Sequence, residues 1–146
     1  MSMDPRIIEL RALGAHIGEH VYLGADVYIE RDFAPLLTIE DGVVLARGVS
    51  VLLHDSALNN VAGEPVKFGR VKLRKECYVG ANATIACGVE IGERAIIGAC
   101  ALVLDDIPAS TYAYGQPARV HGSVADLIDR HRQQAALGER YYYLDL

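Results

Sequence analysis

The chain repeats a hydrophobic pattern every six residues, and this period constrains its fold more than any other feature. An α-helix repeats its face about every 3.6 residues, so a six-residue period does not suit a helix. The period does suit short strands joined by tight turns. Twelve positions at six-residue steps, in three groups separated by interruptions, are all Ile, Leu or Val: Ile17, Leu23, Ile29, Ile39, Leu45, Val51, Leu73, Val79, Ile85, Ile91, Ile97 and Val103.

Three six-residue units make one coil of a solenoid, so the twelve positions predict about four coils. Successive coils would stack at the parallel-strand spacing of about 4.8 Å and bury their aliphatic stripe against one another. The sequence therefore predicts an all-β solenoid. The ends of such a stack must be covered, and two segments have the pattern of short helices that would do this. The second begins with Ser123 as N-cap and ends with Gly138 as C-cap.

We expect a single domain over residues 1–146, since this length is typical of one domain. Its expected parts are an N-terminal helix at 4–13, a β-helix at 16–108 with a loop at 56–71, an exit segment at 109–122 and a C-terminal helix at 123–138.

Composition excludes several functional classes. The formal charge of −5 argues against a nucleic-acid-binding surface, which needs a basic excess. No apolar run has the length of a membrane span, and the first residues lack the apolar core of a signal peptide. Cys77, Cys87 and Cys100 are an odd number without metal-ligand spacing, so we expect reduced thiols in a cytoplasmic protein.

The second interruption of the repeat, "VSVLLHDSALNN" at residues 49–60, contains the candidate site. The pattern stops at His54-Asp55, and a polar, turn-rich loop follows before the pattern resumes near Leu73. Imidazole titrates near neutral pH, which suits His54 to act as a general base. The alternative is an ordinary surface histidine beside a loop. A zinc site is not expected, because no other histidine lies in the later coils.

The hexads and the segment "VEIGERAIIGACALVLDDIPASTYAYGQPARV" at 89–120 together resemble the hexapeptide-repeat acyltransferases. The resemblance implies a left-handed parallel β-helix, an exception to the usual handedness of parallel crossovers. The terminal "D-I-P … Y-G-Q-P-A-R-V" pattern is similar to the galactoside, maltose and polysaccharide O-acetyltransferase branch. Those enzymes are homotrimers with active sites between neighbouring subunits.

The resemblance implies that the chain transfers an acetyl group from acetyl-CoA to a hydroxyl of a sugar or similar acceptor. His54 holds the place of the family's general base, and no metal is expected. One alternative is N-acylation of an amino nucleotide sugar. A second is a non-catalytic trimeric scaffold that has kept the fold and lost coenzyme A.

The resemblance also implies how coenzyme A is bound. We expect backbone groups at Ala81 and Ala99 to contact it, with Arg119 near a phosphate. Tyr78 stands where many relatives have a tryptophan beside the cofactor. Asp105 stands where many relatives have a lysine near the phosphates, so a negative charge replaces a positive one.

Three polar residues are the candidates for binding the acceptor. Asp32, in the first interruption, stands about where an acidic residue of sugar acetyltransferases faces the acceptor; the alternative is a solvated turn residue. Asn59 lies in the polar loop, which could hydrogen-bond a hydroxylated acceptor. If Asp55 continued the strand it would point inward beside His54 and would steady the ring or the loop. If the strand has already ended, Asp55 caps a turn.

Overall fold

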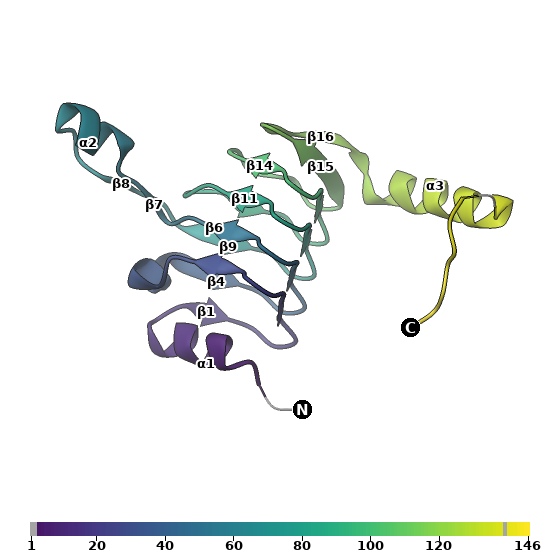
Figure 1. The fold of residues 1–146 in the computed structure, drawn as a ribbon, viewed down its shortest axis with the longest axis horizontal. Helices are drawn as coiled ribbons and strands as arrows, with labels where there is room; N and C mark the ends of the chain where they lie inside the picture. Colours follow the sequence, from purple (N-terminus) through teal and green to yellow (C-terminus); the bar gives the residue numbers. More distant parts are fainter. Residues whose placement is uncertain (1–2, 139) are drawn as a thin grey trace.

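The computed structural model describes residues 3–138 and 140–146, and its strands wind into a left-handed parallel β-helix (Figure 1). This confirms the predicted fold class. Sheet A contains β1 (His16–Ile17), β4 (Leu37–Ile39), β9 (Val71–Leu73) and β12 (Glu90–Ile91). Sheet B contains β2 (Tyr22–Leu23), β5 (Val44–Leu45), β10 (Tyr78–Val79), β13 (Ile96–Ile97), β15 (Thr111–Gly115) and β16 (Ala118–Ser123). Sheet C contains β3 (Tyr28–Ile29), β6 (Ser50–Val51), β11 (Thr84–Ile85) and β14 (Leu102–Val103).

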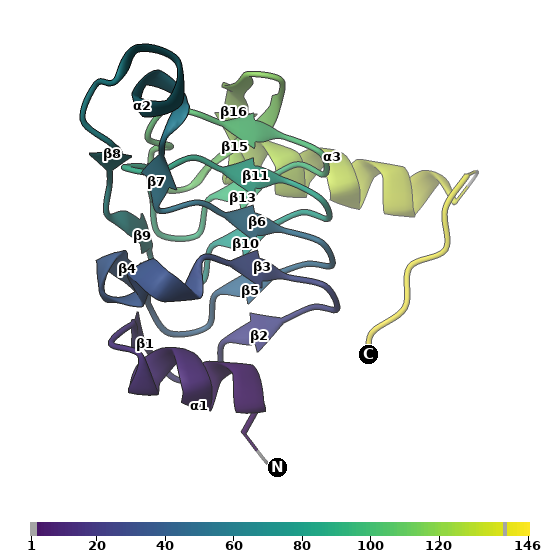
Figure 2. The same ribbon diagram turned by 60° about the vertical axis from the view of Figure 1, so that its left-hand side comes forward.

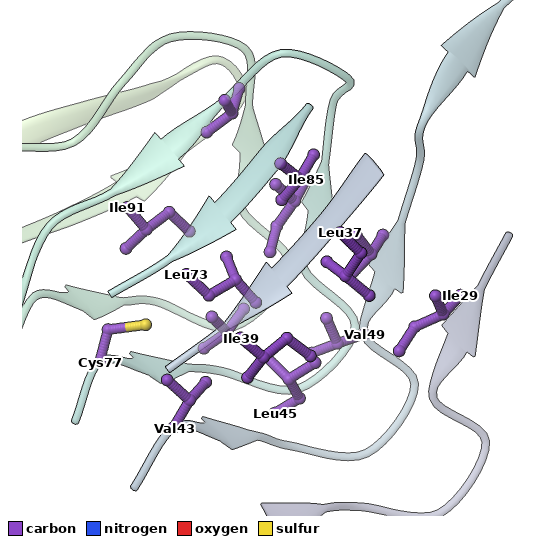
Figure 3. Packing of buried hydrophobic residues seen from close by; sticks show 14 of the residues in the cluster. Ile29, Leu37, Ile39, Val43, Leu45, Val49, Leu73, Cys77, Ile85 and Ile91 are labelled. Carbon is purple, nitrogen blue, oxygen red and sulfur yellow. The ribbon is translucent and has the colours of Figure 1, made fainter. Parts of the chain in front are cut away.

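The aliphatic stripe fills the interior of the coils. All twelve positions of the repeat are buried. Figure 3 shows some of these side chains, such as those of Ile39, Leu45 and Leu73, packed together inside the coils. They stack in register: Ile29, Val51, Ile85 and Val103 form one column through sheet C. Cys77 is part of the same core, and burial raises the pKa of its thiol to about 12.

The turns between sheets bring successive coils into close contact, and Gly80 shows why a glycine is needed there. A Cβ at Gly80 would lie 2.6 Å from the amide nitrogen of Ala99 and 2.8 Å from the carbonyl oxygen of Ile97. Any larger residue would therefore push the coil above it away.

Helix α1 (Pro5–Ala12) covers the N-terminal end of the stack, where it buries Ile7 and Leu10. Asp4 is its N-cap and accepts a hydrogen bond from the Arg6 amide at 2.9 Å. The Arg6 guanidinium donates to the carbonyl oxygens of Leu23 and Gly24, both at 2.7 Å. Because these carbonyls belong to the first coil, Arg6 ties the helix to the solenoid.

Helix α3 (Val124–Leu137) begins after Ser123 and ends at Gly138 in the left-handed conformation, with φ of 62°. It does not cover the C-terminal end, because none of its residues is buried and it extends away from the stack (Figure 1). The last residues of the coils and the exit segment after them cover that end instead. Ile107 bridges to Ile91 in sheet A, and strand β15 adds to sheet B against β13, with Ala113 buried. Within the described part of the chain, no helix is long and apolar enough to cross a membrane.

Candidate active site at the two interruptions

Both interruptions of the repeat leave the same corner of the helix, between sheets C and A. The first is the 3-10 helix η1 (Arg31–Leu36), which follows β3. The second, here called the arm, is formed by β7 (His54–Asp55), helix α2 (Ala57–Ala62) and β8 (Lys67–Phe68). The arm extends outward from the coils (Figures 1 and 2), and its two strands pair antiparallel. Because Leu53 is still fully buried, His54 is the first residue of the arm.

His54 is held by a carboxylate from the coil below. Its Nδ1 lies 2.6 Å from Oε2 of Glu30, and the same oxygen accepts a hydrogen bond from the Leu53 amide at 3.1 Å. Glu30 is 10% exposed and the His54 side chain 30% exposed. An ionised carboxylate only accepts hydrogen bonds, so we assign the ring proton to Nδ1. Nε2 then carries the free lone pair.

Glu30 was not among the residues predicted from sequence, although the repeat contained the signal. Ile29 and Val51 occupy equivalent positions in successive coils and pair in register. The residue after Ile29 therefore stacks below the segment that follows Val51. Counting along the coils places Glu30 below Leu52, two residues before His54, so the repeat would have identified Glu30 as a nearby residue in the coil below.

His54 lies between two open clefts on the surface. The first, the Asp32 cleft, has a volume of about 700 Å³ and is lined by Glu9, Leu13, Tyr28, Ile29, Glu30, Arg31, Asp32, Phe33, Pro35 and His54. The second, the Leu104 cleft, has a volume of about 720 Å³ and is lined by Leu52, His54, Asp55, Ser56, Ala57, Lys67, Thr84, Ala86, Cys87, Leu102 and Leu104. His54 thus belongs to the linings of both clefts.

The candidate acceptor residues separate into two groups. Asp32 is exposed and lines the same cleft as His54. Asp55 is also exposed rather than directed inward, because the arm has already left the coil; its Oδ1 accepts from the Ala57 amide at 2.9 Å, as a turn cap does. The Asn59 amide donates to the carbonyl oxygen of Glu64 at 2.7 Å, inside the arm. Asn59 lines neither cleft.

The candidate cofactor residues also separate. Arg119 lies on β16 beside Asp105, with Nη1 and Oδ2 3.9 Å apart, and Asp105 directly follows Leu104 of the Leu104 cleft. Tyr78 is on the outward face of sheet B, and Ala81 and Ala99 lie in stacked turns between sheets B and C. Within one chain, Arg119 therefore lies on the same side of the helix as His54. The other three candidate cofactor residues, Tyr78, Ala81 and Ala99, do not.

The residues that the structure describes contain no group of three or more His, Cys, Asp or Glu side chains that could hold a metal ion. His121, outside the candidate site, stacks on Tyr114 with ring centroids 3.6 Å apart, which is a structural role.

Comparison with known proteins agrees with these features. Residues 70–105 match the family of bacterial transferase hexapeptide repeats. The chain is 38% identical over 86 residues to a dTDP-3-amino-3,6-dideoxy-α-D-galactopyranose 3-N-acetyltransferase from Aneurinibacillus thermoaerophilus. That match covers 56% of the chain and 45% of the relative, so the chain spans less than half of this relative's length. The galactoside O-acetyltransferase of Escherichia coli is 28% identical over 156 residues, covering 93% of the chain and 72% of the relative.

Solved structures have the same fold. A maltose O-acetyltransferase from Clostridium difficile superposes with a TM-score of 0.62 at 25% identity, covering 78% of this chain and 72% of that one. A hexapeptide-repeat acetyltransferase from Vibrio cholerae, solved with acetyl-CoA, superposes with a TM-score of 0.65 at 22% identity, covering 84% and 79%. The chain therefore contains hexapeptide repeats of the bacterial transferase type over residues 70–105, and it is similar in sequence and fold to acetyltransferases that carry such repeats.

Proposed function

We propose that the protein is an acetyl-CoA-dependent O-acetyltransferase that acts on a hydroxyl of a sugar or similar acceptor, with His54 as the general base. The observation that carries this proposal is the Glu30–His54 pair, which engages Nδ1 and leaves Nε2 without a hydrogen-bond partner among the described residues, on a histidine that lines both clefts. Acetyl transfer to a hydroxyl needs two substrates to meet at one base. A cleft on either side of His54 meets that requirement.

In the proposed reaction, Nε2 of His54 takes the acceptor hydroxyl proton as the oxygen attacks the thioester carbonyl. The resulting imidazolium is stabilised by the Glu30 carboxylate on the opposite side of the ring. When the tetrahedral intermediate collapses, the carbon–sulfur bond breaks and the proton passes from Nε2 to the departing thiolate. The products are the acetyl ester and free coenzyme A, and His54 returns to its neutral form.

The Leu104 cleft is the proposed site of the thioester arm of acetyl-CoA. Four aliphatic side chains, those of Leu52, Ala86, Leu102 and Leu104, line it along the outward side of successive coils. Arg119 lies beyond its far end and would meet a phosphate. Tyr78, Ala81 and Ala99 are assigned to the cofactor surface of a neighbouring subunit, because in one chain they do not share a corner with His54.

The Asp32 cleft is the proposed acceptor site, with Asp32 as a hydrogen-bond acceptor for substrate hydroxyls. Glu30 is engaged with His54, and Arg31 forms an ion pair with Glu9, so both are committed to contacts within the chain. The contacts of Asp55 and Asn59 are within the arm, and they give no support for direct acceptor binding by either residue.

We further propose that the protein is a homotrimer whose subunits meet through sheet B. The outward residues of sheet A are polar: His16, Thr38, Lys72 and Glu90. Those of sheet B are aromatic or aliphatic: Tyr22, Val44, Tyr78, Ile96 and Tyr112. An apolar face of this length is typical of a contact surface. Light scattering at micromolar concentration tests the trimer, and a monomeric mass would contradict it.

The enzymatic proposal is tested by thiol release from acetyl-CoA over a panel of sugars, with the His54→Asn variant. Loss of the general base should lower turnover by about 10²–10⁴-fold. The Tm and the acetyl-CoA-induced rise in Tm should persist, because His54 lies outside the buried stripe. His16→Asn, on the outward face of sheet A, is the matched control and should keep full activity. Near wild-type turnover by His54→Asn would show that His54 is not the base.

N-acetylation is the second candidate, and the 38% identity to an amino sugar N-acetyltransferase favours it. The same panel with amino sugars and amino nucleotide sugars decides between the two. A preference for the amine at equal concentration would replace the O-acetyltransferase proposal. Absence of both turnover and an acetyl-CoA-induced rise in Tm would favour the non-catalytic scaffold.

A further inference from the structure

Two phenylalanines, one from each interruption, meet at the His54 ring. Phe68 on β8 pairs directly with His54 across the antiparallel ladder of the arm, so both side chains lie on the same side of it. Phe33 belongs to η1. The ring centroids of Phe33 and His54 are 4.8 Å apart, those of His54 and Phe68 6.0 Å, and those of Phe33 and Phe68 5.1 Å. The three rings therefore form one cluster.

The cluster is only partly covered by the protein. Phe33 is half-buried, with part of its surface against the core, and it lines the Asp32 cleft. Phe68 is 50% exposed. Single exposed apolar residues are common on protein surfaces, but these two contact each other and the proposed base. An apolar surface beside a reacting group is typical of a substrate-binding site.

The rest of the Asp32 cleft complements this apolar surface. Its carboxylates include Glu9, Glu30 and Asp32, and Asp32 has no ion pair among the described residues. A molecule that fits both features has hydroxyls around its edge and an apolar C–H face. A pyranose-type ring has this shape. An open-chain polyol or hydroxy amino acid has the hydroxyls but no fixed apolar face, and it loses more conformational freedom when bound.

We propose that Phe33 and Phe68 determine specificity by forming a platform on which the acceptor ring packs, so that cyclic acceptors are selected over open-chain ones. This inference rests on the proposed acetyltransferase function. It adds two residues that the sequence did not suggest as site residues. It also gives the arm a role in acceptor choice through Phe68, whereas Asp55 and Asn59 are engaged within the arm.

The test compares kcat/KM for methyl hexopyranosides and for the corresponding hexitols, which carry similar hydroxyls without the ring. Wild type should prefer the pyranosides. Phe68→Leu should lower kcat/KM for them by about 3- to 10-fold and leave the hexitol values unchanged, because an aromatic contact of this kind contributes modestly. Phe68→Tyr should retain the preference. Phe33→Leu, which keeps most of the volume at a half-buried site, should reproduce the effect of Phe68→Leu.

Leu58→Ala is the matched control, since Leu58 is an exposed apolar residue of the arm on α2. It should leave the preference unchanged. An equal loss for both acceptor types in Phe68→Leu would mean that Phe68 acts on His54 rather than on the acceptor, and would overturn the proposal. A wild-type preference for hexitols or L-serine would overturn it while leaving the acetyltransferase function intact. No turnover of any acceptor would instead remove the function on which the inference rests.

Discussion

The interior of the coils and the corner at His54 both depend on the six-residue repeat, but they differ in burial and in the residues that they contact. In the third coil, Leu73, Val79 and Ile85 are completely buried in the cluster of apolar side chains that forms the core. At the corner, His54 and Phe68 are partly exposed, and both contact Phe33 of the other interruption. The interior should therefore determine stability, and the corner should determine chemistry.

The register of the coils explains how the two regions coexist. Leu37 follows the first interruption and Val71 follows the second, yet the two pair directly in sheet A. Both insertions thus leave the stack and return without shifting the coils. The repeat can tolerate a long arm at this corner because the strands on either side stay in place.

The largest effect on stability is expected from the interior. Ile85→Ala removes three methyl or methylene groups from a fully buried position between Val51 and Val103. Substitutions of this kind cost about 2–5 kcal/mol, which lowers Tm by roughly 5–20 °C. Thermal and urea denaturation measure the loss. Turnover per folded molecule, measured well below Tm, should be nearly unchanged.

Ile85→Val is the graded control, with an expected cost of about 0.5–1.5 kcal/mol. A loss of turnover in either variant at a temperature where it is fully folded would contradict the separation between interior and corner.

Glu30 lies where the interior and the corner meet, and its substitution is expected to have the second-largest effect, a loss of turnover. A hydrogen bond between charged groups contributes about 1.5–3 kcal/mol, so Glu30→Gln should lower turnover by about 10- to 150-fold. The binding of acetyl-CoA should not change, because Glu30 lines only the Asp32 cleft. Steady-state kinetics with both substrates varied provides the measurement. Wild-type turnover in Glu30→Gln would mean that the 2.6 Å contact has no part in the reaction.

The sequence predicted the interior well because a single period determines it. Every aliphatic position of the repeat is buried, and Ser123 and Gly138 bound the C-terminal helix as their capping preferences indicated. The prediction that this helix covers the C-terminal end of the stack was wrong. Helix periodicity indicates an amphipathic face but does not show which part of the protein packs against it.

The corner was predicted only in part, because contacts between insertions have no sequence period. His54 was visible as a break in the pattern. Its contacts with Phe33 and Phe68 depend on how β7 and β8 pair after the chain leaves the coil. The same pairing determines the orientation of Asp55, which is exposed and caps a turn. This is the second of the two alternatives that the sequence left open for Asp55.

The third and smaller expected effect comes from the N-cap of helix α1. As with the interior, a substitution there should change stability and leave turnover unchanged. Hydrogen bonding to the Arg6 side chain lowers the pKa of Asp4 from its usual value. A carboxylate with a depressed folded-state pKa stabilises above its unfolded pKa of about 3.9, and this contribution is lost as pH falls through the folded pKa. Asp4→Ala should cost about 0.5–2 kcal/mol at pH 7.

Asp4→Asn separates charge from capping, since asparagine is also a good N-cap. Its Tm should lie below that of wild type at neutral pH and approach it as the pH is lowered toward 3. Thermal denaturation across this range is the measurement. A difference that stays constant with pH would show that the Asp4 charge contributes nothing.

The smallest effect concerns Asp105, at the far end of the proposed cofactor cleft. Its carboxylate lies 3.9 Å from Arg119, and both side chains are largely exposed. Exposed pairs contribute about 0–1 kcal/mol, so Asp105→Lys should leave Tm nearly unchanged. It should tighten the binding of coenzyme A by about 2- to 5-fold, because the charge beside Arg119 becomes positive where a phosphate is proposed to bind. Isothermal titration with coenzyme A gives the affinity.

Asp26→Lys is the matched control for Asp105→Lys. Asp26 forms a similar exposed pair with Arg47, at 3.5 Å, in a turn between sheets B and C, and its substitution changes the net charge by the same amount. An effect confined to Asp105 should also diminish at high salt, since exposed charges are screened over about 10 Å at 0.1 M ionic strength. Equal tightening in both variants would assign the effect to net charge. Tightening in Asp105→Lys alone would place the phosphates of coenzyme A beside Arg119, at the same corner as His54.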